Sequence, residues 1–317
     1  MFEQLDDIVL HLHELETKIR ESANNVRKQK HNFGLEEELV HALSPMKFDG
    51  GVGAVDAGVL AREVQGYDVV LTKTVGVNFV YNESKLVLAN YYPSVSPTNK
   101  LHVQSSLNEH EILISRNLIR LNEEIKNAIE LIERFKPEVV LIDGSLVPLP
   151  NDRPEEKSNL FDLYQELILN YKKLFATKSL IIGITKDSRS KRFVNSVGID
   201  FANDTKLMNY LLNEDERSFA MAYSEKPTQI TKDLENEIYC FYMRPLENDL
   251  PLRVEFLTKD FDKVASIVYS LSKISRSFAY PAALIEADLR AALNPLEMER
   301  FDRLNLTPLR RNNRPFR

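Results

Sequence analysis

Two aspartates each follow a run of apolar residues, which is an uncommon place for a charge. Asp56 lies in the stretch GAVDAGVL, and Asp143 ends the apolar run of VVLIDGSL. Ligands of open α/β sheets gather where strands end, so two such strands side by side would bring the carboxylates together. Like charges that close repel unless a cation separates them, and oxygen ligands select hard ions such as Mg²⁺ or Mn²⁺. In the alternative reading, each aspartate only caps the turn after its strand.

A third carboxylate comes from a stretch with helical spacing, from about Glu109 to Phe135. At about 100° per residue its apolar side chains form one stripe, made of Leu118, Leu121, Ile125, Ala128, Ile129, Ile132 and Phe135. Glu124 lies at the margin of this stripe, whereas Glu123 points to the opposite side and is expected to be a solvated surface charge. A glutamate at the edge of a buried face costs solvation energy unless it is paired or binds metal. Glu124 is therefore the third candidate ligand.

The order of the expected elements indicates the fold that positions these carboxylates. Alternating and apolar runs predict strands at 51–58, 67–82, 84–92, 139–144, 179–186, 238–245 and 252–258, and 3.6-residue periodicity predicts helices at 109–135, 159–175, 261–274 and 282–293. Three strands followed by helix, strand, helix and strand fit an α/β sheet with an antiparallel meander at one side and parallel strands at the other. The ribonuclease H-like fold has this order, with flanking helices. It places acidic residues on its first strand, its helix and the end of its fourth strand.

Composition narrows the class of protein. The chain has 317 residues, and 43% hydrophobic with 28% charged residues is ordinary for a soluble globular protein. No apolar run is long enough to span a bilayer, and one cysteine, Cys240, excludes an internal disulfide and a cysteine-ligated zinc cluster. We therefore expect a cytoplasmic protein without membrane contact. The net charge of −6 means that DNA would have to be bound by local basic patches.

The chain resembles the NurA nucleases, which are partners of HerA-type DNA-translocating ATPases in DNA end resection. Five stretches carry the likeness in the family's order: VDAG from residue 55, RLNEEIKNAI from 120, VVLIDGSL from 139, IIGITKDSRS from 181 and YPAALIEADLRAAL from 280. The resemblance implies a ribonuclease H-like core, a metal-dependent nuclease site, and a homodimer that docks on a hexameric HerA-like ATPase in double-strand break repair. It also implies an amino-terminal helical region at 1–50, a nuclease domain at 51–300 and a basic tail at 301–317.

The resemblance also assigns site residues. The family's first-strand aspartate, helix glutamate and fourth-strand aspartate correspond to Asp56, Glu124 and Asp143, and its lysine after the fifth strand corresponds to Lys186. Two Mn²⁺ or Mg²⁺ ions would be held by the three carboxylates together with Asp288. Such ions activate water and stabilise the leaving oxygen in phosphodiester hydrolysis. Lys186 would neutralise charge in the transition state or position the scissile phosphate.

Two departures from the family pattern leave alternatives open. The first-strand motif, usually Asp-Gly-Ser, reads DAG here and keeps its carboxylate. Asp288 stands where the family usually has a histidine, and an aspartate can ligate a hard cation but cannot act as a neutral imidazole base near pH 7. A non-catalytic structural partner of the ATPase is therefore one alternative. An actin-like or sugar-kinase-like ATP-binding protein is another, disfavoured by only 10 glycines and the lack of a glycine-rich adenosine loop.

A basic run follows the fifth strand. The segment KDSRSKR places Lys186, Arg189, Lys191 and Arg192 within seven residues. Such a run is usually a solvated loop, but beside a carboxylate cluster it is a candidate for holding the DNA backbone. The resemblance to the NurA nucleases implies a 5′–3′ exonuclease, a single-strand endonuclease or both, and the residues themselves do not distinguish these activities. The amino-terminal amphipathic helix and the tail arginines Arg310, Arg311, Arg314 and Arg317 are the predicted contacts with partner proteins.

Overall fold

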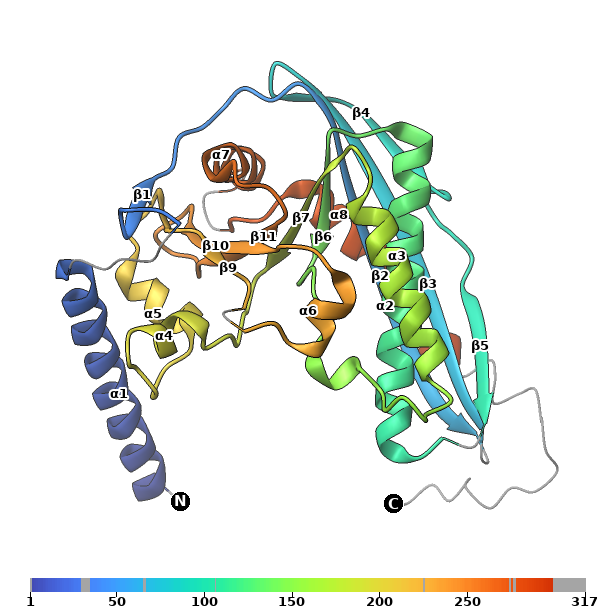
Figure 1. Ribbon diagram of the computed structural model, residues 1–317, viewed down its shortest axis with the longest axis horizontal. Coiled ribbons are helices and arrows are strands. Elements are labelled where there is room, and N and C mark those ends of the chain that lie inside the picture. Colours follow the sequence, from blue (N-terminus) through green and yellow to red (C-terminus); the bar gives the residue numbers. More distant parts are fainter. Residues whose placement is uncertain are drawn as a thin grey trace.

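The computed structural model describes residues 2–29, 35–64, 67–105, 107–224, 226–273, 275 and 278–298 (Figure 1). The strands are β1 (Val40–Ala42), β2 (Gly50–Val64), β3 (Tyr67–Asn82), β4 (Lys85–Tyr92), β5 (Lys100–Ser105), β6 (Val139–Asp143), β7 (Leu180–Thr185), β8 (Glu216–Ser218), β9 (Met221–Ala222), β10 (Tyr239–Arg244) and β11 (Leu252–Phe256). The helices are α1 (Phe2–Lys28), α2 (Glu109–Phe135), α3 (Phe161–Phe175), α4 (Arg192–Ser196), α5 (Asp204–Leu211), α6 (Gln229–Leu234), α7 (Phe261–Ser272) and α8 (Ala282–Ala291), with a 3₁₀ turn at Pro150–Asp152.

One mixed sheet unites the described strands in the order β1-β8-β10-β11-β7-β6-β2-β3-β4, with β5 beside β3 and β9 beside β10. The meander β2-β3-β4 is antiparallel, and β3 is long enough to pair with β4 along one half and with β5 along the other. The centre, β2-β6-β7, is parallel, because α2 and α3 carry the chain back between these strands. The predicted fold class, a mixed sheet with a meander and flanking helices, is confirmed.

The central strands are buried on both faces, which explains why VVLID and LIIGIT read as continuous apolar runs. Residues of α2 and α3 share one hydrophobic core with Val140 and Ile142. Residues of α7 and α8 share another with Leu141 and Ile184, on the opposite face. Figure 1 shows α2 and α3 lying together on one side of β2 and β6, away from α7. The site residues lie where these layers meet the carboxyl ends of β6 and β7.

The amino-terminal helix uses only part of its apolar stripe. Near its carboxyl end Ile19 and Val26 are buried in a third core with residues of α5, whereas Ile8, Val9 and Leu12 are between 48% and 56% exposed. None of the helices that the structure describes is long and apolar enough to cross a membrane. The proposed boundaries at 50 and 300 stay predictions, and the tail 301–317 lies outside the described residues.

The segment between β7 and β10 contains elements that we did not predict. The helices α4, α5 and α6 have five to eight residues, and β8 and β9 have three and two. The strand β5 was also missed, although it pairs with β3 over six residues. Elements this short show too few repeats for a period of 2 or 3.6 to stand out.

Candidate active site

The sheet register places Asp56 and Asp143 next to each other. The parallel pair β2–β6 aligns Val55 with Ile142, so the two aspartates are the next residues on neighbouring strands. Neighbouring strands are about 4.8 Å apart. Because β2 continues well past the end of β6, Asp56 lies in mid-strand opposite Val75 of β3, while Asp143 is the last residue of its strand. Both side chains are half-buried at this step in the sheet.

The environment of Asp56 disfavours its negative charge. Burial raises the pKa of its carboxyl to about 6, and the charges of Asp143 and Asp288 add to the rise. A hydrogen bond from the backbone of Ala57 and the charge of Arg120 act in the opposite direction. The electrostatic coupling shows that Asp56, Asp143 and Asp288 lie within one field of like charge.

Glu124 reaches the same field from α2. It is 1% exposed, Arg120 Nη1 donates to its Oε2 over 2.6 Å, and its Oε1 has no hydrogen-bond partner among the described residues. Burial raises the pKa of Glu124 to about 8; the charges of Asp56 and Asp143 add to the rise, against the opposing effect of Arg120. The helical spacing of the apolar residues therefore correctly predicted that Glu124 faces the interior.

The neighbouring glutamate differs from its prediction in one respect. Glu123 does point away from Glu124, but it is not freely solvated: its side chain is only 12% exposed and forms an ion pair with Lys100 of β5. The unpredicted strand β5 supplies this partner.

Asp143 is held by two side chains from distant segments. Tyr280, just before α8, donates its hydroxyl to Asp143 Oδ1 over 2.8 Å. Lys186 Nζ lies 3.4 Å from Asp143 Oδ2 and 4.0 Å from the centroid of the Tyr280 ring. Burial and the charge of Asp143 raise the pKa of Tyr280, so it remains a hydrogen donor. Sequence reasoning used Tyr280 only to count to Asp288; its place in a Tyr-Pro motif was the available signal.

Asp288 lies at the solvent side of the site. Its helix α8 packs so closely on β2 that a Cβ on Gly58 would lie only 2.2 Å from the carbonyl oxygen of Ala291. This contact requires the glycine of the DAG motif. Asp288 itself is exposed, contrary to the expected inward position, yet its charge still raises the pKa of Asp56 and of Tyr280.

The donor chemistry of the site fits a hard divalent cation. Among the described residues, no group of three or more His, Cys, Asp or Glu side chains is arranged so that it could hold a metal ion as it stands. The donors near Asp56 are nevertheless all carboxylate oxygens, which are the ligands that Mg²⁺ and Mn²⁺ select. One oxygen of Glu124 is buried without a partner, and a cation would satisfy it. A shared cluster of Asp56, Glu124 and Asp143 stays a prediction.

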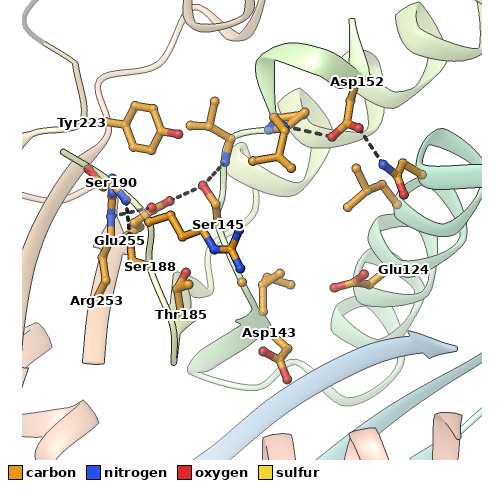
Figure 2. Close-up of a pocket in the computed structure, with 18 of the residues that line it drawn as sticks. Glu124, Asp143, Ser145, Asp152, Thr185, Ser188, Ser190, Tyr223, Arg253 and Glu255 are labelled. Atoms are coloured by element: carbon orange, nitrogen blue, oxygen red, sulfur yellow. Dashed lines mark hydrogen bonds and ion pairs between the residues drawn. The ribbon is translucent and has the colours of Figure 1, made fainter. Parts of the chain in front are cut away.

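A cavity of about 640 Å³ opens beside these carboxylates (Figure 2). Glu124 and Asp143 line one part of it, and Arg189 lines it from the loop after β7. The rest of the basic run is arranged differently. Lys191 Nζ donates to the carbonyl oxygen of Asp200 over 3.3 Å, and Arg192 lines a smaller neighbouring hollow.

The comparison with known domains decides the family. A sequence profile of the NurA domain matches residues 48–293, most of the chain. The chain belongs to the NurA nuclease family. This confirms the family expected from the five sequence stretches. No curated protein sequence matches the chain.

Solved NurA structures have the same fold over nearly the whole chain. The NurA nuclease from Sulfolobus solfataricus has a TM-score of 0.61 at 16% identity and covers 96% of this chain and 94% of its own. A NurA structure bound to dAMP and manganese has a TM-score of 0.66 at 12% identity, with 98% of each chain covered. Another NurA with manganese has a TM-score of 0.57 at 11% identity, covering 96% of this chain and 97% of its own. At these identities the likeness establishes the NurA fold.

Proposed function

We propose that this protein is a metal-dependent DNA nuclease that hydrolyses phosphodiester bonds. The observation that carries the proposal is the register of β2 and β6, which makes Asp56 and Asp143 neighbours in a region where carboxylates outnumber basic groups. Membership of the NurA family, and the manganese and dAMP bound to related structures, support the same activity.

Asp56, Glu124 and Asp143 are the metal ligands in this proposal, with Asp288 at the rim. Bound Mn²⁺ or Mg²⁺, as a pair of ions, supplies an activated water and a counter-charge for the leaving oxygen. Tyr280 fixes the orientation of Asp143 through its hydrogen bond. The charge of Arg120 limits the repulsion between Glu124 and the other carboxylates.

Lys186 is the catalytic cation of the proposed site. Its ammonium lies 3.4 Å from Asp143 and over the Tyr280 ring, so it is held at the edge of the carboxylate field. From there it can hold the scissile phosphate and stabilise the charge that develops on it. Arg189, Lys191 and Arg192, from the segment after β7, bind the DNA backbone. The activity is that of a 5′–3′ exonuclease, a single-strand endonuclease or both.

The same proposal includes a biological setting, which is suggested by membership of the family. The protein acts as a homodimer with a HerA-like hexameric ATPase in DNA end resection and double-strand break repair, in the cytoplasm. The exposed apolar residues Ile8, Val9 and Leu12 of α1 are available for such contacts. Light scattering of the wild type and of an Ile8→Ser/Leu12→Ser variant tests the dimer. A monomeric wild type at micromolar concentration would contradict it.

The nuclease proposal is tested directly with labelled single-stranded and double-stranded DNA. We expect cleavage by the purified protein in Mn²⁺ or Mg²⁺, no cleavage in EDTA, and stimulation by the ATPase. Absence of cleavage under all metal conditions, with and without the ATPase, would identify the chain as the non-catalytic partner instead.

A further inference from the structure

A buried arginine lines the cavity on the side away from the carboxylates. Arg253 of β11 is 6% exposed, and its guanidinium lies 5.1 Å from the centroid of the Tyr223 ring. Its Nε is 3.0 Å from Glu255 Oε1, which is an ion-pair distance, but this nitrogen has no hydrogen-bond partner among the described residues. A buried guanidinium whose N–H groups are incompletely used is costly, unless a ligand completes its hydrogen bonds.

Glu255 ties this arginine to the turn that follows Asp143. Its Oε2 accepts hydrogen bonds from the Ser145 hydroxyl over 2.8 Å and from the Leu146 backbone N–H over 2.9 Å. The carboxylate therefore accepts two hydrogen bonds and forms one ion pair, and it fixes the guanidinium relative to the turn at residues 144–146. Figure 2 shows Glu255 between Arg253 and Ser145 on one side of the cavity.

Arg253, Glu124 and Asp143 line the same cavity from different elements. Arg253 is opposite Thr185 on β7, and Asp143 is beside Ile184 on the same strand. Arg253 and Asp143 are thus two strands apart, which is roughly 10 Å between backbones. The cavity of about 640 Å³ lies between them and has the size of a small-ligand site. Val147, Pro148 and Tyr223 give it apolar walls against which a base and sugar can pack.

We propose that Arg253 binds the terminal phosphate of the DNA strand, so that the cavity holds the last nucleotide while the next phosphodiester lies at the carboxylates. This inference rests on the proposed nuclease function. A terminal phosphate monoester fits a deeply placed guanidinium better than an internal phosphate does, because no chain has to leave again on the far side. The planar fork of arginine also matches phosphate oxygens two at a time.

The test compares single-stranded oligonucleotides that differ only in one terminal group. One pair has a phosphate or a hydroxyl at the 5′ end, and a second pair has the same difference at the 3′ end. Cleavage is measured as kcat/KM in Mn²⁺, and binding is measured by fluorescence anisotropy with the Asp143→Asn protein in EDTA. We expect a phosphate at one of the two ends to raise both quantities by roughly tenfold or more, the effect of one charge-assisted hydrogen-bonded contact.

The decisive variant is Arg253→Met/Glu255→Gln, which removes both charges, since removing one partner would leave a buried charge uncompensated. We expect its preference for the phosphorylated end to fall to about onefold. Arg253→Lys keeps the charge without the fork, and is expected to lose most of the preference. Arg153→Met removes an arginine that lines a separate groove, so this variant should keep the preference for the phosphorylated end. Circular dichroism confirms that each variant is folded.

Two results would overturn the inference: a wild type that ignores the phosphate at both ends, or an Arg253→Met/Glu255→Gln protein that keeps the preference. If the double variant does not fold, an Arg253→Lys protein with the full preference has the same meaning. The binding arm needs no cleavage. A protein that cuts no DNA but binds phosphorylated ends through Arg253 would contradict the nuclease proposal and support the phosphate site.

Discussion

Two charge clusters in this protein differ in whether their surroundings favour the negative charge of a carboxylate, which we call balanced, or disfavour it, which we call unbalanced. Arg217 is 1% exposed, and its terminal nitrogens donate to Glu36 over 2.7 and 2.8 Å and to Asp262 over 2.6 Å. At Asp56 and Glu124, by contrast, burial raises the pKa, and the charge of Asp143 adds to the rise. In the first cluster burial would raise the pKa of Glu36, but the hydrogen bonds and charge of Arg217 lower it. This cluster joins the segment before β1 to β8 and α7. The second has excess negative charge, which is what a cation site requires.

Breaking the balanced cluster should affect folding rather than chemistry. Arg217→Met leaves Glu36 half-buried without its partner, so we expect the free energy of unfolding to fall by about 3–5 kcal/mol. Urea denaturation followed by circular dichroism measures this loss. Cleavage per folded molecule at low temperature should stay close to wild type. A large loss of activity in protein that is still folded would mean that this cluster also shapes the site.

Removing a carboxylate from the unbalanced cluster should have the opposite outcome. Asp143→Asn and Glu124→Gln keep the side-chain shape but remove a metal-binding charge, so cleavage should fall by about two to three orders of magnitude. Each change relieves repulsion between carboxylates but also removes the charged partner of Arg120 or Lys186, so stability without metal is measured alongside cleavage. Glu123→Gln, one residue from Glu124 but paired with Lys100, is the matched control and should cleave normally. Near-normal cleavage by Asp143→Asn in Mn²⁺ would show that Asp143 only caps the turn after β6.

The pH dependence of stability gives a third contrast. Folding raises the pKa of Asp56 from 3.8 to about 6 and that of Glu124 from 4.5 to about 8, so the folded state binds these protons more tightly than the unfolded state. Their contribution to stability is therefore fully present below the unfolded-state pKa values. It is lost as the pH rises through the folded-state pKa values, about 6 for Asp56 and about 8 for Glu124. We expect the Tm of the metal-free protein to fall over this range.

Divalent metal should cancel that loss. At the alkaline end of the range, Mn²⁺ at a hundred times its Kd would add about 2.7 kcal/mol of stability, because it binds only the folded site. The Glu124→Gln protein provides the control, with a flatter pH curve and a smaller response to Mn²⁺. A Tm that is independent of both pH and Mn²⁺ would show that these carboxylates are not a cation site.

The smallest effect is expected at Asp288, which is exposed at the rim. Asp288→Ala should lower cleavage a few-fold by weakening metal binding. Asp288→His should keep or raise it and shift the metal preference from Mg²⁺ towards Mn²⁺, since imidazole suits softer ions. Leu289→Ala, an exposed neighbour on α8, is the control. Rates and metal preferences equal to wild type in both Asp288 variants would remove this residue from the chemistry.

Long elements with many repeats of one period were predictable from the amino-acid sequence alone. The bounds of α2, 109–135, and of β3, 67–82, agree with the prediction, and the apolar stripe of α2 distinguished Glu124 from Glu123. Apolar runs that end in aspartate located Asp56 and Asp143. Asp143 is at the end of its strand as expected, whereas Asp56 lies in the middle of β2, which continues to Val64. These signals are local, and local periodicity is what a single sequence records.

Contacts between distant segments were decided only by the tertiary structure. The hydroxyl of Tyr280 reaches Asp143 from 137 residues away, and Glu255 reaches the turn after β6 from 110 residues away. Arg253 and Glu255 alternate with apolar residues in LRVEF, and this pattern alone would assign them to a solvent-facing side of the strand. They are buried because the turn after β6 and the ring of Tyr223 lie against them. Which face of a strand is covered depends on segments elsewhere in the chain, so no local pattern reports it.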